Sequence, residues 1–261
     1  MNVIPANKKP FFELNHRLSG YDMLTLATKF KPHRPAFETA LAAGFQAAEF
    51  WLDADLLANE DEIADLASHY PFRYALHFPN SGPIPDEALR SAVTLYRRVN
   101  CTAMVIHQPM FVRYHEALLK LDPKLDLAIE NHVLDLDRFA QWAERSPGLT
   151  LDVEHLWKFT LNDAPFATLM EHVELFLKKW ASKLQHVHLP GYQPGDEEHQ
   201  PVHFSEEMAN HVMTRLAEHG FTKLVVSELD SPFQSLEYLK KDVEMFDRWK
   251  KSLETTTVSG C

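Results

Sequence analysis

The chain has 261 residues, of which 45% are hydrophobic and 24% charged, so it is long enough to bury a substantial core in one domain. Its formal net charge of −11 gives no overall positive field for a phosphate backbone, and the composition therefore disfavours nucleic acid as a partner. Two cysteines, Cys101 and Cys261, are too few for a disulfide framework and fit a reducing compartment as free thiols.

The first 20 residues lack the apolar core of a signal peptide, and no run of about 18 apolar residues occurs in the chain. We therefore expect a cytoplasmic protein with no membrane partner. Phe11, Phe12 and Leu14 are apolar anchors in this segment. Residues 1–20 are accordingly predicted to form an N-terminal extension that lies over the main domain.

After residue 20, short apolar runs alternate with segments of helical periodicity, which is the pattern of repeated strand–helix units. Strands are predicted at 23–29, 46–52, 72–78, 102–107, 125–130, 148–153, 184–189 and 223–229. Helices are predicted at 34–43, 54–69, 85–99, 109–121, 134–145, 163–181, 205–219 and 235–252. Eight strands in this order close into a barrel, so the predicted fold is α/β, a single (β/α)8 TIM barrel within residues 1–252. The polar segment 253–261 is expected to be a disordered tail.

Acidic and histidine residues recur at the ends of the predicted strands. In chain order they are Glu49, His77, His107, Glu130, Asp152, His188 and Glu228. The carboxyl ends of all strands face one mouth of such a barrel, and burying an unpaired carboxylate or imidazole is costly, so this recurrence indicates one shared site. Mixed oxygen and nitrogen ligands suit a divalent ion such as Mn²⁺, Co²⁺, Mg²⁺ or Zn²⁺. The alternative is a set of unrelated polar residues at the starts of surface loops.

The order of these residues resembles the xylose isomerase-like TIM barrels, a family that includes sugar-phosphate isomerases and epimerases, inosose dehydratases and the endonuclease IV type of abasic-site nuclease. The resemblance covers residues 22–250 and begins with LTLATKF and the glutamate-bearing GFQAAEFWL. In the isomerases and epimerases, one divalent metal ion is held by residues similar to Glu130 in AIEN, Asp152 in LDVEH, His188 in HVHLP and Glu228 in VSELD. His155 matches a histidine that contacts substrate or a second metal in that family.

The resemblance implies an enzyme that acts on a small sugar, keto-sugar or polyol. A metal in this position can polarise a carbonyl and stabilise the enediolate that forms when the adjacent carbon loses a proton. Glu130 and Glu228, from strands on opposite sides of the mouth, are the expected catalytic residues, one taking the proton and the other returning it. Isomerisation, epimerisation and loss of water share this first step, and the sequence leaves all three open.

Five residues are expected to bind substrate beside the metal: Glu49, His77, His107, His155 and Lys158. Lys158 is a candidate contact for a phosphate or carboxylate group. His186 lies on the same face of its strand as His188, but a deeper position in the barrel explains it equally well, so it is left out of the predicted site. The sequence is also compatible with a homo-oligomer.

Two departures from the isomerase pattern keep other functions open. Many of the family's sugar isomerases follow the seventh-strand histidine with an acidic residue and an arginine, whereas this chain has Leu189-Pro190-Gly191-Tyr192. His77 and His107 resemble histidines of the trinuclear nuclease sites, so a zinc phosphodiesterase of the endonuclease IV type is the alternative. The nuclease pattern also includes an Asp-x-His pair after strand seven. If His203 aligns with the histidine of that pair, Pro201 takes the position of the aspartate. A catalytically inactive binding barrel is the third possibility.

Overall fold

The computed structural model of the chain describes residues 24–258, without the side chains of Leu136 and of residues 255–258. The expected N-terminal extension and Cys261 lie outside the described residues. Cys101 is a buried free thiol, and burial raises its pKa well above the usual range. Within the described part of the chain, no helix combines the length and the apolar character that a membrane span requires.

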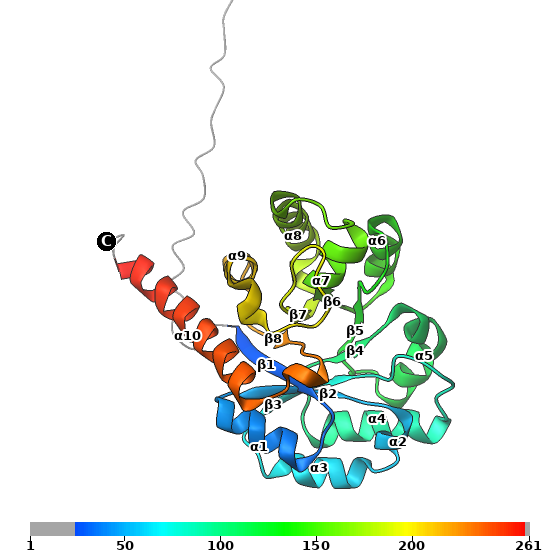
Figure 1. The fold of residues 1–261 in the computed structure, drawn as a ribbon. Helices are drawn as coiled ribbons and strands as arrows, with labels where there is room; N and C mark the ends of the chain where they lie inside the picture. The colour runs from blue at the N-terminus through cyan, green and yellow to red at the C-terminus, as the bar shows by residue number, and fades with distance from the viewer. Residues whose placement is uncertain (1–23, 259–261) are drawn as a thin grey trace, which may run out of the picture.

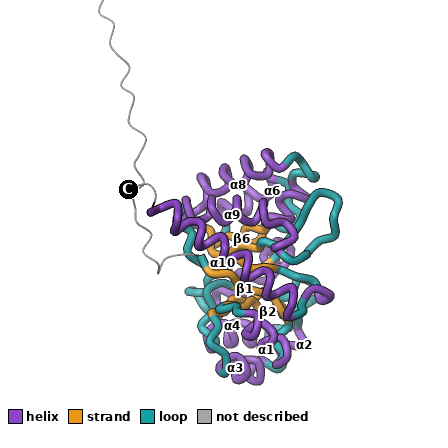
Figure 2. Tube along the Cα trace, turned by 60° about the vertical axis from the view of Figure 1, so that its left-hand side comes forward, coloured by secondary structure: helices purple, strands orange, loops and turns teal. Residues whose placement is uncertain are grey.

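Eight parallel strands form a closed barrel in chain order, with β8 pairing back onto β1, which confirms the predicted (β/α)8 fold. The strands are β1 (Thr25–Phe30), β2 (Ala47–Trp51), β3 (Arg73–His77), β4 (Met104–Ile106), β5 (Leu127–Glu130), β6 (Gly148–Asp152), β7 (Leu184–His188) and β8 (Leu224–Ser227). Figure 2 shows these strands in the middle of the molecule with helices around them.

Helices follow the strands and cover the outside of the barrel (Figure 1). They are α1 (Arg34–Ala43), α2 (Ala54–Leu57), α3 (Glu60–Ser68), α4 (Asp86–Arg98), α5 (Gln108–Leu121), α6 (Leu136–Arg145), α7 (Val153–His155), α8 (Phe166–Trp180), α9 (Glu206–Glu218) and α10 (Leu236–Val258). Short irregular turns complete the set: the π-helical turn η1 (Leu156–Thr160) and the 3₁₀ turns η2 (Ala181–Lys183), η3 (Val202–Ser205) and η4 (Ser231–Phe233).

Two predicted helix boundaries were wrong. The helix expected at 54–69 is divided into α2, which Asp53 caps by accepting a hydrogen bond from the Leu56 N–H, and α3, whose first turn carries three acidic residues. The tail expected from residue 253 begins with helix instead, because α10 continues to Val258. Leu253 lies one helical turn after the buried Trp249 and packs against the core, which extends the apolar face of α10 past the predicted end at 252.

The strand ends place the predicted site residues at one mouth of the barrel. His77, Glu130, Asp152 and His188 are the last residues of β3, β5, β6 and β7. Asp152 and His188 are register partners on neighbouring strands. Because all eight strands are parallel, the side chains at their carboxyl ends share one side of the barrel.

An aromatic cluster fixes the helix that covers β1 and β2. Phe37 on α1 is fully buried, and its ring lies 5.1 Å from Phe30 of β1 and 5.5 Å from Phe50 of β2 between centroids. Tyr70 stacks on the same ring at 4.7 Å. Aromatic pairs at these distances add to the free energy gained from burial. The cluster therefore holds together the two strands that also carry Lys29 and Glu49.

We predict that Phe37→Ala lowers the free energy of unfolding by about 3–5 kcal/mol, because it leaves a cavity among packed rings. Leu41→Ala on the same helix is the matched control, since Leu41 is 44% exposed, and its effect should stay within about 0.5 kcal/mol. Urea denaturation followed by circular dichroism measures both. Equal losses in the two variants would show that the cluster adds no stability beyond helix propensity.

Candidate metal centre

Four side chains bring one donor atom each to a common point at the mouth of the barrel. The Nδ1 atom of His188 lies 2.9 Å from Glu228 Oε2, 3.4 Å from Glu130 Oε2 and 3.5 Å from Asp152 Oδ2. Each of these four atoms is buried and has no hydrogen-bond partner. They belong to the four residues that the sequence predicts as metal ligands.

The other polar atom of each ligand is held by a protein partner. Lys29 Nζ donates to Glu228 Oε1 at 2.5 Å, and the His155 backbone N–H donates to Asp152 Oδ1 at 2.7 Å. His155 Nδ1 lies 3.1 Å from Glu130 Oε1, and the Nε2 atom of His188 lies 3.1 Å from Glu49 Oε2. A carboxylate only accepts, so His188 Nε2 carries a proton that it donates to Glu49 Oε2, and once Nδ1 has lost its own proton its lone pair would face the other three donors.

This donor set fits a divalent metal ion. Four ligands in a tetrahedron with bonds of about 2.1 Å are separated by about 3.4 Å, close to the three distances from His188 Nδ1. Buried polar atoms without partners are rare in folded proteins, because their desolvation is not repaid. A cation bound by Glu130, Asp152, His188 and Glu228 would satisfy all four.

The charges of the cluster explain its pKa shifts in the metal-free protein. Burial alone would raise the pKa of the Glu228 carboxyl, but Lys29 and His188 hold it well below its usual range. Burial would lower the pKa of His188, yet Glu49 and Glu228 raise it above its usual range. For His155, Asp152 and Glu130 outweigh burial and raise the pKa to about 10. Cations thus already surround the carboxylates, and a metal ion would replace the proton on His188 Nδ1.

His77 and His107 face the metal ligand Glu130. The Nε2 atoms of His77 and His107 lie 3.4 Å and 3.3 Å from Glu130 Oε2. The Nδ1 atom of His77 is 3.0 Å from the Phe78 carbonyl, which can only accept, so the Nε2 lone pair of His77 points at the carboxylate. These two histidines therefore offer further nitrogen ligands next to the four-atom set.

Two residues expected to bind substrate have other partners. Glu49 is fully buried, and its carboxylate contacts His188, Lys29 and, at 2.6 Å, the Nε2 atom of His186. This placement favours orientation of His188 over contact with a substrate. Lys158 lies in the turn η1 and pairs with Glu198 at 3.0 Å.

Several residues at the site are not among the predicted ones. Lys29 and His186 are buried among the ligands, and the only sequence signal for Lys29 is a charge inside the apolar run TLATKF. His132 stacks on His107 with ring centroids 4.1 Å apart. Glu154 is buried, and burial together with Asp152 raises its pKa to about 8.

The loop after β7 brings His199, and not His203, to the site. His203 is bound to Asp242 of α10, with its Nδ1 atom 2.6 Å from Asp242 Oδ1. The His199 N–H donates to Glu154 Oε2 at 3.0 Å, and the His199 Nε2 atom lies 3.7 Å from Glu228 Oε1. His155, Glu198 and His199 form a group whose donor atoms are close enough to hold an ion. The alignment of His203 with the nuclease pattern is therefore not supported.

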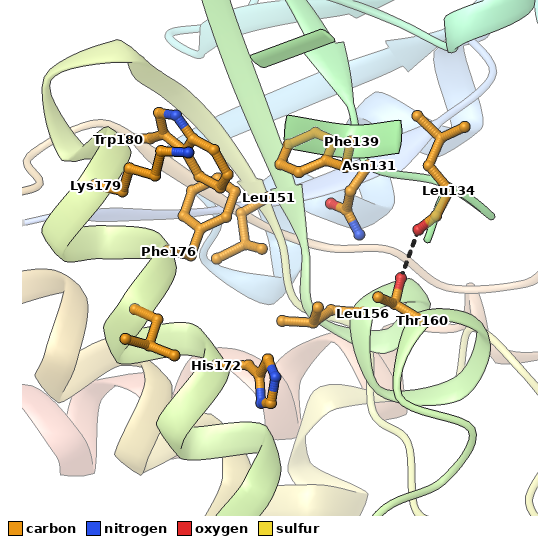
Figure 3. A pocket seen from close by; sticks show the side chains of 11 residues that line it. Asn131, Leu134, Phe139, Leu151, Leu156, Thr160, His172, Phe176, Lys179 and Trp180 are labelled. Carbon is orange, nitrogen blue, oxygen red and sulfur yellow. Dashed lines mark hydrogen bonds between the residues drawn. The ribbon is translucent and has the colours of Figure 1, made fainter. Parts of the chain in front are cut away.

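Asn131 connects the ligand strands β5 and β6. Its side-chain amide donates to the Asp152 carbonyl at 2.9 Å and accepts from the Asp152 N–H at 2.7 Å. Asn131 also lines a mostly apolar cavity of about 200 Å³ between α6, α8 and η1, which none of the predicted site residues line (Figure 3). That cavity is separate from the cluster of metal ligands.

Solved structures share this fold at low sequence identity. Endonuclease IV from Thermus thermophilus superposes with a TM-score of 0.58 at 13% identity, covering 87% of this chain and 99% of its own. D-allulose 3-epimerase from Methylomonas sp. superposes with a TM-score of 0.56 at 15% identity, covering 87% of this chain and 97% of its own. Protein SMc04130 from Sinorhizobium meliloti 1021 superposes with a TM-score of 0.57 at 16% identity, covering 86% of this chain and 98% of its own. No protein-family model and no curated protein matches the chain. These likenesses show the barrel fold that the resemblance implies.

We predict that Asp152→Ala and Glu228→Ala each weaken metal binding without unfolding the barrel, because both ligands lie at strand ends. Glu49→Gln should weaken binding about 10–100-fold, the usual effect of removing a residue that orients a metal-bound histidine. Isothermal titration of chelator-treated protein with Mn²⁺ or Zn²⁺ measures the affinities, and exposed Glu207→Gln is the control. If both alanine variants kept full metal content, the metal site would lie elsewhere.

Proposed function

We propose that the chain is a divalent-metal-dependent isomerase or epimerase that acts on a small sugar, keto-sugar or polyol through an enediolate. The observation that carries this proposal is the convergence of four buried, unpartnered donor atoms from Glu130, Asp152, His188 and Glu228. Two of these residues are the carboxylates that the mechanism needs. Glu228, with 14% of its side chain exposed, is the least buried of the four ligands.

The charge of the cluster supports a single metal ion. Glu49, Glu130, Asp152 and Glu228 supply four negative charges within it, and Lys29 and a protonated His155 supply two positive charges. One divalent ion would complete the balance once His188 gives up its extra proton. A second or third ion would leave the buried cluster with an excess of positive charge.

In this proposal Glu130, the last residue of β5, and Glu228, which follows β8 directly, are the two catalytic carboxylates. When bound, the metal would polarise the substrate carbonyl and make the adjacent C–H more acidic. His107, His155 and His77 lower the pKa of Glu130, and Lys29 and His188 lower that of Glu228, in both cases against the effect of burial. Each carboxylate is therefore ionised at neutral pH and can accept a proton. His155 and Lys29 hold one oxygen of Glu130 and Glu228 respectively, which fixes the orientation of both bases.

We predict that Glu130→Gln and Glu228→Gln slow proton transfer by about 10²–10⁴-fold, the usual contribution of a general acid or base. Glutamine keeps the size of the side chain and one ligand oxygen, so some metal should remain bound. Incubation with a panel of ketoses and polyols in D₂O, followed by NMR, measures turnover and deuterium incorporation at the altered carbon. Exposed Glu207→Gln is again the control. Normal turnover by both metal-loaded variants would rule out an enediolate mechanism that uses these carboxylates.

A zinc phosphodiesterase of the endonuclease IV type is the second candidate. It is favoured by the approach of His77 and His107 to Glu130, which would suit a further ion, and by the group His155, Glu198 and His199. The chain's net charge of −11 opposes it, because binding to duplex DNA draws on contacts between basic residues and phosphates. A barrel that binds a ligand without catalysis remains the third proposal if purified protein holds no metal.

His107→Ala separates the two enzymatic proposals. Under the isomerase proposal this variant keeps one metal ion per chain, because His107 is not among the four ligands. Under the phosphodiesterase proposal it loses one zinc ion, and the wild-type protein holds two or three. Inductively coupled plasma mass spectrometry gives the counts, and incision of a duplex with one abasic site is the activity control. We expect one ion and no incision; zinc-dependent incision would overturn the isomerase proposal.

A further inference from the structure

Lys29 closes a ring of charged contacts behind the metal ligands. Its Nζ atom lies 2.5 Å from Glu228 Oε1 and 3.4 Å from Glu49 Oε1. The second oxygens of the same two carboxylates meet the two sides of the His188 ring, Glu228 Oε2 at Nδ1 and Glu49 Oε2 at Nε2. Glu49 and Glu228 therefore each bridge Lys29 and His188, one oxygen contacting the lysine and the other contacting the histidine.

Lys29 is enclosed in this ring, because only 6% of its surface is exposed. A buried ammonium is costly unless anions compensate its charge, and here two carboxylates do so. The converse also holds, since Glu49 and Glu228 would lose their compensating cation if Lys29 were neutral. Lys29 therefore occupies the position of a cation between two buried carboxylates.

One nitrogen donor is available at Glu49, one of the two carboxylates that Lys29 contacts. His186 is fully buried, and neither of its ring nitrogens has a hydrogen bond of acceptable geometry. Glu49, His186 and His188 bring one donor atom each within 4.8 Å of one another, and because both nitrogens of His188 are already engaged, His186 is the nitrogen of this group that could bind a further ion. The residues around the ammonium would thus suit a metal ion, apart from the presence of Lys29.

We infer that Lys29 is a resident cation that takes the place of a second divalent metal ion between Glu49 and Glu228. This inference rests on the metal centre proposed above. The ammonium keeps one oxygen of Glu228 away from the metal, so that this carboxylate binds through its other oxygen. With Lys29 in place, the part of the mouth that β1, β2, β7 and β8 form can hold only one divalent ion.

The test counts metal ions in the full-length protein. Chelator-treated wild type and Lys29→Met are equilibrated with excess Mn²⁺ or Zn²⁺, desalted and analysed by mass spectrometry. Methionine removes the charge at nearly constant volume, and we expect one more ion per chain than in the wild type. Metal should also raise the melting temperature of Lys29→Met more than that of the wild type, because the added ion replaces a lost cation.

Controls locate the effect at the carboxylate pair. Lys29→Arg keeps the charge and should bind the wild-type number of ions, as should Lys31→Met, which removes an exposed lysine two residues away. The double variant Lys29→Met/Glu49→Gln, counted at a metal concentration that still saturates its weakened first site, should return to the wild-type number. Lys29→Gln, whose amide can still donate to Glu228, is used if Lys29→Met does not fold.

The two proposals fail in different measurements. The ion count of the wild type tests the metal centre, whereas the difference between Lys29→Met and the wild type tests the role of Lys29. An unchanged or lower count in folded Lys29→Met or Lys29→Gln overturns the inference, because Lys29 would then only position Glu228. A gain that survives in the double variant overturns it as well, since the added ion would not lie at Glu49.

Discussion

The architecture of the mouth depends on the compensation of four buried carboxylates, Glu49, Glu130, Asp152 and Glu228. Carboxylates so close together and so far from water repel one another and lose hydration, so the fold has to supply positive charge among them. Lys29 contacts two of them and His155 contacts the other two. Among the buried atoms without a hydrogen-bond partner are one oxygen each of Glu130, Asp152 and Glu228 and the Nδ1 atom of His188, and the three oxygens all lie within 3.5 Å of that nitrogen. These four atoms without partners are the reason for proposing a metal ion at this point.

Parallel strand order is what makes such a cluster possible. Residues more than 100 positions apart in the chain, such as Glu49 and His188, meet because their strands end at the same mouth. Rigid packing then restricts the ligands further. The aromatic cluster around Phe37 joins β1 to β2, and Asn131 joins the end of β5 to that of β6. Each strand therefore delivers its donor atom in one orientation, which is the condition for a metal site with little reorganisation.

The fold could be predicted from the sequence because the eight strands appear as short apolar runs and the segments between them have helical periodicity. The candidate site residues could be proposed because each lies at or near the end of such a run, and the resemblance to the xylose isomerase-like barrels then implied which four of them bind metal. Lys29 was not predicted, since nothing in its neighbours along the chain shows that it faces buried carboxylates from other strands, and His186 was left out because its strand face is equally compatible with a deeper position in the barrel. The position of His199 depends on a loop in which Glu154 holds the backbone, a contact between residues 45 positions apart. Helix ends such as that of α10 depended on packing that periodicity does not reveal.

The central claim is that one divalent ion lies among Glu130, Asp152, His188 and Glu228. A crystal structure of the Mn²⁺-loaded protein, with anomalous diffraction recorded at the manganese edge, tests it most directly. The account predicts one strong anomalous peak within about 2.3 Å of Glu130 Oε2, Asp152 Oδ2, His188 Nδ1 and Glu228 Oε2, with Lys29 still in contact with Glu228. The absence of that peak, or a single peak held by His77 and His107 instead, would contradict it.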